Sequence, residues 1–353
     1  MISQEQTGAA VVRAVDALPR SVIRALAGRP VEIDGQRLEP EVQLLMRLLG
    51  RRSSAEYGEP SEARAERARE ATVFRGKTFT VGRVEELSIP GPAGPIGARL
   101  YVPAGAPVPA PLLVYLHGGG WVVCDLDTHD NGCRFLARET GVLVLSVDYR
   151  LAPEHPFPAA VDDALTAFRF VIDNARDLGA AEGAVAIGGD SAGANLAIVV
   201  SRLSGSDGDR APAFTLGLYP VTDLSTKRHS YRLFGENFLL TEAQMDWYRE
   251  HYLRDDSAAL DPRASPILAT DLTGLPPTYI ATAGFDPLRD EGEEYALRLR
   301  EAGVQVACRR HRGLIHGFLN AVGSTRFARI AMQEAAGALR LGLAVGQVGS
   351  RAS

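Results

Sequence analysis

The stretch AVAIGGDSAGANLA, residues 184–197, joins a short apolar strand pattern to a helical pattern through the motif G-x-S-x-G. Ser191 lies at the centre of the motif, with Gly189 and Gly193 two positions away on either side. A serine on a sharp strand-to-helix turn has a strained backbone, and larger side chains at those two positions would clash. The pattern predicts an exposed Ser191 hydroxyl and places the N–H of Ala192 at the positive end of the next helix. A plain turn with an incidental serine is the alternative that this motif alone leaves open.

Strand and helix patterns alternate on both sides of this motif. This alternation implies a mostly parallel sheet with right-handed crossovers, and therefore an α/β fold. Runs of almost fully apolar residues suit strands that are covered on both faces. Two further patterns, around the turn PGPAGP, predict antiparallel strands before the parallel ones. The apolar runs lie at residues 111–117, 142–149, 184–189, 214–220 and 278–284, with a last strand at 304–311.

Two segments outside this alternation are expected to form a cap over the carboxyl ends of the strands. Residues 1–75 contain three helical patterns with apolar residues three and four positions apart. A second excursion, at about 224–260, leaves the carboxyl end of a parallel strand, where ligands bind in open α/β sheets. Residues 76–346 then form the main domain.

Composition excludes several classes of protein. The 353 residues carry a net charge of −5 and have no basic stripe that would indicate nucleic-acid binding. Cys124, Cys133 and Cys308 lack C-x-x-C spacing, which argues against a disulfide framework and against a zinc site. The amino terminus does not resemble a secretory signal, and no apolar run is long enough for a membrane span. We therefore expect a cytoplasmic protein that needs no metal or organic cofactor and has no stable membrane insertion.

A second glycine motif, His117-Gly118-Gly119-Gly120-Trp121, follows the strand pattern that ends at Leu116. Three consecutive glycines let the backbone approach a ligand and present N–H groups to it. Acyl transfer needs such donors at the carbonyl oxygen that becomes negative, in an arrangement called an oxyanion hole. A phosphate-binding loop is the alternative, but the Lys-Ser/Thr ending and the G-x-G-x-x-G spacing are missing.

An activated serine needs a base, and the base needs a carboxylate that orients it. The acid is expected after a later strand, and Asp286 follows the run 278–284 by two positions. Asp290 and Glu291 are alternatives, although both fall at the start of a helix, where carboxylates are favoured for another reason.

Only two histidines follow Asp286 in the chain, His311 and His316. His316 lies in the sequence GLIHGFL, in the predicted loop after the last strand, where a glycine-flanked imidazole can reach the serine. His311 falls near the end of the strand itself. His316 is therefore the preferred base.

Taken together, HGGGW, DYRLAPEHPFPAAVDDA, GDSAGANLA, DPLRDEGEEYA and HGF resemble the motifs of the hormone-sensitive-lipase-like esterases, also called bacterial family IV. The resemblance covers about residues 80–340, and Asp190 matches the branch with GDSAG. It implies an α/β-hydrolase fold with a helical cap. It also implies a catalytic triad of Ser191, Asp286 and His316.

The same resemblance assigns an oxyanion hole to Gly118, Gly119, Gly120 and Ala192, with Gly118 shaping the loop. The expected activity is hydrolysis of short- to medium-chain carboxylic esters, and the family suggests a homodimer. Amidase, lactonase or acyltransferase chemistry could use the same site. A non-catalytic receptor of this architecture should lack a triad member, and none is missing here.

Trp121 and Trp247 are candidates for substrate binding. Trp121 ends the glycine motif, and Trp247 lies within the second cap excursion. Ordinary core packing is the alternative for each indole.

Overall fold

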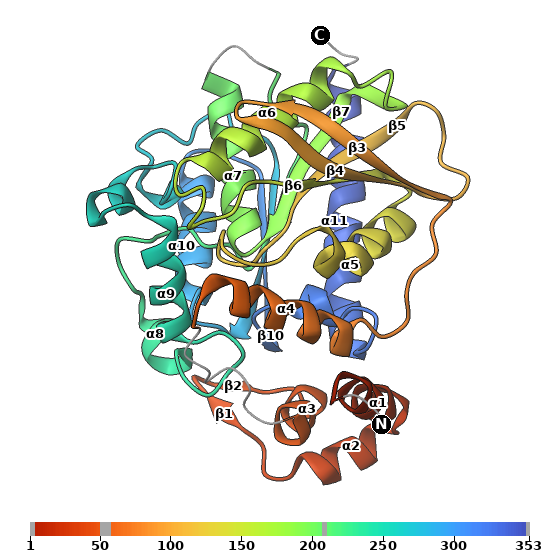
Figure 1. Cartoon of the computed structure of the whole chain (residues 1–353), viewed down its shortest axis with the longest axis vertical. Helices are drawn as coiled ribbons and strands as arrows, with labels where there is room; N and C mark the ends of the chain where they lie inside the picture. Colours follow the sequence, from red (N-terminus) through yellow and green to blue (C-terminus); the bar gives the residue numbers. More distant parts are fainter. Residues whose placement is uncertain (1–3, 50–57, 207–209, 351–353) are drawn as a thin grey trace.

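The structure is a computed structural model and describes residues 4–49, 58–206 and 210–350. An eight-stranded sheet forms its centre (Figure 1). The strands, in their spatial order, are β10 (Val306–Ile315), β9 (Thr278–Phe285), β8 (Thr215–Leu218), β7 (Ala180–Asp190), β5 (Ala110–Leu116), β6 (Leu143–Asp148), β4 (Gly94–Val102) and β3 (Arg83–Gly91). All neighbouring pairs from β10 to β6 are parallel, whereas β4 pairs antiparallel with β6 and β3 pairs antiparallel with β4. The mostly parallel sheet confirms the expected α/β fold.

Helices cover both faces of the sheet. Alternate side chains of each strand point to opposite faces, so the apolar residues of a strand must be buried on both sides. In β5, Leu113 and Tyr115 pack with residues of α5 (Leu126–Thr140) and α11 (Arg326–Ser350). Leu112, Val114 and Leu116 pack with residues of α6 (Ala159–Asp173) and α7 (Ala192–Ser206) on the other side. α10 (Arg289–Glu301) lies beside β9 on the α7 side. A strand covered twice reads as an unbroken apolar run, which explains the sequence pattern.

The last strand is longer than its sequence pattern. β10 ends at Ile315, whereas the apolar pattern predicted an end at residue 311. β10 is an edge strand and most of its residues are exposed or partly buried, so polar residues such as Arg309 and Arg312 are tolerated in it. This extension brings the strand directly to His316.

The amino-terminal helices gather at one end of the molecule (Figure 1). α1 (Gln4–Ala17), α2 (Arg20–Ala27) and α3 (Pro40–Leu49) share a small apolar cluster with Val73 of α4 (Pro60–Phe74). In Figure 1, α4 lies between these helices and the sheet. Residues 1–3 and 50–57 of the expected cap segment lie outside the described residues. No described helix is both long enough and apolar enough to cross a membrane.

One short hairpin was not expected from the sequence. β1 (Glu32–Ile33) and β2 (Gln36–Arg37) pair through the turn Asp34-Gly35, in which both residues have positive φ (54° and 65°). Asp-Gly is a favoured sequence for such a turn. The hairpin places Gln36 beside β9, as described below.

The second expected cap excursion contains two helices, α8 (His229–Phe234) and α9 (Glu242–Tyr252). Both lie on the side of the molecule next to α10 and the amino-terminal hairpin (Figure 1). Short 3₁₀ helices follow at η2 (Asp256–Leu260), η3 (Pro266–Leu268) and η4 (Phe318–Ala321).

Candidate active site

Ser191 lies between the last residue of β7 and the first residue of α7. Its φ is +53°, the left-handed value expected of a strained strand-to-helix turn. A Cβ atom on Gly189 would come within 2.3 Å of the Leu116 carbonyl oxygen, and one on Gly193 within 2.0 Å. The two glycines are therefore required because the turn presses against the end of β5.

Ser191, His316 and Asp286 form a continuous hydrogen-bonded chain. The Oγ of Ser191 lies 3.0 Å from Nε2 of His316, and Nδ1 of His316 lies 2.8 Å from Oδ2 of Asp286. Asp286 is fully buried, and its Oδ1 accepts the Leu288 N–H at 2.9 Å. The three residues follow β7, β10 and β9, whose parallel direction brings their carboxyl ends to one edge of the sheet. The structure thus brings together the three residues that the sequence predicted.

The alternative acids make other contacts. The carboxylate of Asp290 accepts the Ser230 N–H, and that of Glu291 accepts the N–H groups of Thr222 and Asp223. The alternative base, His311, packs edge-on against Phe318, with the ring centres 5.4 Å apart. None of these contacts connects them to Ser191.

The glycine loop lies beside Ser191 and shows why glycine is needed at two of its positions. Gly119 and Gly120 have φ values of +117° and +58°, and a Cβ atom on Gly120 would come within 2.2 Å of the Tyr248 ring. Among the described residues, none accepts a hydrogen bond from the N–H of Gly119 or Gly120. Ala192 is the first residue of α7, so its N–H has no acceptor within the helix. These three N–H groups are available to a ligand.

Asp190 connects the glycine loop to the serine turn. Its Oδ1 accepts the Gly118 N–H at 2.9 Å and the Tyr115 hydroxyl at 2.7 Å. Burial alone would raise the pKa of Asp190, but His129 and these two hydrogen bonds outweigh burial and lower the pKa. The Gly118 N–H is thereby engaged inside the protein. This agrees with a loop-shaping role for Gly118.

His117 supports the loop and is poorly suited to act as a base. Burial and the neighbouring His129 lower the pKa of His117 to about 4. Its ring stacks on Tyr149 at 4.3 Å, and its Nδ1 lies 2.8 Å from the Gly118 carbonyl oxygen. The neutral ring donates to that carbonyl and helps to fix the loop.

A mostly apolar cavity of about 170 Å³ opens beside His316 and Gly317. Four of its lining residues, Val42, Leu45, Met46 and Leu49, lie on α3 at the spacing i, i+3, i+4 and i+7. This spacing is visible in the sequence, but the four residues were not predicted to line a site, because a helical apolar face does not distinguish a cavity wall from ordinary core. Further lining comes from α4 (Arg67, Glu70, Ala71, Val73, Phe74), from Asn237, Phe238 and Leu239, and from residues 314–318, 320 and 321.

The two tryptophans do not line this cavity. Trp121 is fully buried, and its ring stacks on Tyr252 with the centres 4.1 Å apart. Trp247 packs against Tyr248 and His251 of its own helix. The structure therefore brings neither indole to the cavity beside His316.

Comparison with known sequences agrees with this arrangement. A family model described as alpha/beta hydrolase fold matches residues 113–320, which include Ser191, Asp286 and His316. The chain is 48% identical over 319 residues to the carboxylic ester hydrolase LipN of Mycobacterium tuberculosis, covering 88% of this chain and 84% of LipN. It is 37% identical over 270 residues to an ethyl acetate hydrolase of Pseudomonas putida, covering 74% of this chain and 83% of that enzyme.

Solved structures show the same similarity. An α/β hydrolase enzyme from the metagenome of Lake Arreo, Spain, is 41% identical, with a TM-score of 0.83 over 86% of this chain and 98% of that one. EstE1, a thermostable carboxylesterase cloned from a metagenomic library, is 39% identical, with a TM-score of 0.79 over 81% of this chain and 98% of that one.

Proposed function

This chain belongs to the α/β-hydrolase family and, within it, to the hormone-sensitive-lipase-like ester hydrolases; from this premise we propose that Ser191, His316 and Asp286 are its catalytic triad. The protein is a carboxylesterase. The observation that carries the proposed triad is the unbroken relay, 3.0 Å from serine to imidazole and 2.8 Å from imidazole to carboxylate.

The relay has the geometry of a two-step acyl transfer. His316 accepts the proton of Ser191 as the hydroxyl oxygen attacks the ester carbonyl, while Asp286 holds the imidazole in the required tautomer. The alcohol leaves with a proton from His316. Water then attacks the acyl-enzyme by the same route and releases the acid.

The negative oxygen of each tetrahedral intermediate is assigned to the N–H groups of Gly119, Gly120 and Ala192. The free N–H groups in the loop and the helix start of α7 support this assignment. Gly118 takes a supporting role, since its N–H is bonded to Asp190.

The proposed substrates are esters of short to medium acyl chain. The cavity of about 170 Å³ beside His316 supports this size range, because its lining is mostly apolar and includes residues of α3 and α4. The helices of residues 4–49 and 58–75 and those at about 224–260 form the proposed cap on the domain 76–346.

A cytoplasmic location is supported by three free cysteines. The proposed homodimer is checked by light scattering.

The experiment that tests this function combines labelling and substitution. A fluorophosphonate probe should label the wild-type protein at Ser191 and should not label the variant Ser191→Ala. The same variant should hydrolyse p-nitrophenyl butyrate at least about 10³-fold more slowly, with an unchanged circular dichroism spectrum. Undiminished turnover by Ser191→Ala would remove this serine from the mechanism.

A further inference from the structure

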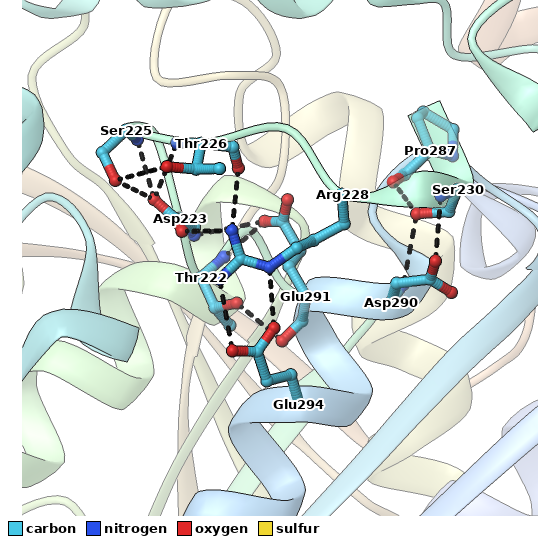
Figure 2. Close-up of polar contacts among 10 residues, drawn as sticks. All are labelled: Thr222, Asp223, Ser225, Thr226, Arg228, Ser230, Pro287, Asp290, Glu291 and Glu294. Carbon is cyan, nitrogen blue, oxygen red and sulfur yellow. Dashed lines mark hydrogen bonds and ion pairs between the residues drawn. The ribbon is translucent and has the colours of Figure 1, made fainter. Parts of the chain in front are cut away.

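The loop that carries Asp286 is attached to the second cap segment by a buried serine of α8. Figure 2 shows Ser230 pointing at this loop from above the start of α10. The Ser230 hydroxyl donates to the Pro287 carbonyl oxygen at 2.5 Å, and the Ser230 N–H donates to Oδ2 of Asp290 at 2.9 Å. The Asp290 N–H lies 3.3 Å from the same hydroxyl oxygen. Ser230 thus contacts Pro287, which directly follows Asp286, and Asp290, which lies four positions after Asp286.

The far end of the loop is fixed by Glu291, which is fully buried. Its Oε1 accepts the Thr222 N–H at 2.8 Å and the Asp223 N–H at 3.2 Å, while its carbonyl accepts the Thr222 hydroxyl at 2.9 Å. Asp223 pairs with Arg228 at 2.9 Å, and Arg228 pairs with Glu294 of α10 at 2.7 Å (Figure 2). The segment that leads into α8 is therefore tied to α10 at several points.

The amino-terminal hairpin contacts the same region independently. The Gln36 side chain donates to the Gly284 carbonyl oxygen at 3.2 Å, two residues before Asp286. Asp34 forms an ion pair with Arg289 at 2.8 Å. Both cap segments therefore contact the end of β9 and the loop that follows it.

Catalytic groups must be held to within about half an ångström of their productive positions, and the contacts behind them supply that precision. Within the loop itself, the hydrogen bond from Leu288 orients the Asp286 carboxylate. We propose that Ser230 is a positioning residue of the triad: it holds the Asp286 loop, so that the cap segment sets the geometry between the acid and His316. This proposal rests on the triad assigned above.

The test compares three variants in the full-length protein, with p-nitrophenyl butyrate as the substrate. Ser230→Ala removes the hydroxyl that contacts the loop, and kcat should fall about tenfold while KM stays within about twofold. Ser230→Thr keeps a hydroxyl and should recover most of the loss. Ser225→Ala is the matched control, because the Ser225 hydroxyl bonds to Asp223 and does not contact the Asp286 loop. It should leave kcat and KM unchanged.

Rates are expressed per competent site, counted by titration with a p-nitrophenyl phosphonate, so that partial unfolding does not lower the measured kcat. An unchanged kcat in Ser230→Ala, or a loss confined to KM, overturns the positioning role. Equal losses in Ser230→Ala and Ser225→Ala overturn it as well.

A second pair of variants reaches the loop from its other end and decides the case if Ser230→Ala does not fold. Glu291→Ala removes the acceptor for Thr222 and Asp223, and kcat per site should fall. Glu291→Gln keeps an acceptor oxygen and should restore most of it. Equal kcat in both variants contradicts the proposal. The triad has its own test: activity retained by Ser191→Ala refutes the triad, whereas an inactive Ser191→Ala with a fully active Ser230→Ala refutes the positioning role alone.

Discussion

Oδ1 of Asp190 accepts the backbone N–H of Gly118 at 2.9 Å, so the residue before Ser191 fixes the position of the glycine loop. The same oxygen accepts the Tyr115 hydroxyl, and the carboxylate is buried. The serine turn and the proposed oxyanion donors are thus joined by one side chain. A substitution there should affect both the fold and the rate.

We expect Asp190→Ala to destabilise the protein by about 3–5 kcal/mol, because it leaves several buried partners without a bond. We expect kcat to fall on the order of 10²-fold, because the N–H groups of Gly119 and Gly120 would no longer be held in the orientation that the oxyanion requires. Tyr115→Phe is the control: it removes one partner of Asp190 and keeps the bond to Gly118. It should cost about 1 kcal/mol and change kcat little. Denaturant unfolding measures the free energy of unfolding of both variants, and steady-state kinetics measure kcat. A larger loss of kcat in Tyr115→Phe than in Asp190→Ala would contradict the explanation.

The two late histidines should differ sharply. His316→Ala removes the imidazole that contacts Ser191, and kcat should fall at least about 10³-fold. His311→Ala removes a ring that packs against Phe318, so its effect on kcat should stay within about threefold. Kinetics on both variants at the same pH check the assignment. The opposite result would identify His311 as the base.

The sequence was sufficient to predict the proposed triad, because each member of the triad places a recognisable requirement on the chain. The turn at Ser191 needs glycines on both sides, and the order serine, acid, histidine left one preferred base. Asp286 and His316 follow strands whose carboxyl ends share one edge of the sheet. These constraints are local or topological, so a single sequence records them.

The cavity and the support behind Asp286 were not predictable in the same way. The apolar face of α3 has the same sequence pattern whether the helix covers a core or lines a cavity. Ser230 is one serine among many, and its contact with Pro287 spans 57 positions in the chain. Trp121 shows the opposite case. Its place next to the glycine loop in the sequence suggested substrate binding, yet its ring stacks on Tyr252 and does not line the cavity. Such features depend on how distant elements pack.

The cavity wall on α4 offers a test of acyl-chain preference. Ala71 lines the cavity, so Ala71→Leu should fill part of it and shift the optimum of a p-nitrophenyl ester series to shorter chains. Ala68 lies one turn earlier on the exposed face of the same helix, and Ala68→Leu should leave the optimum unchanged. If both variants keep the wild-type optimum, the cavity does not hold the acyl chain.

Glu291 should make stability depend on pH in a direction opposite to that of most carboxylates. Burial raises the pKa of Glu291 well above 4.5, its ordinary value, despite the hydrogen bonds from Thr222 and Asp223. The folded protein therefore keeps a proton that the unfolded chain releases, so the contribution of this group to stability is lost progressively as the pH rises above 4.5.

Glu291→Gln replaces the protonated acid by a neutral group of similar shape that cannot ionise. The free energy of unfolding of Glu291→Gln should increase relative to that of the wild type as the pH rises from about 5 to about 7. Urea denaturation at several pH values measures this difference. Glu294→Gln is the control, because Glu294 lies on the same helix but is partly exposed and pairs with Arg228. A difference between Glu291→Gln and the wild type that is constant across this range would mean that Glu291 does not bind its proton more tightly in the folded state.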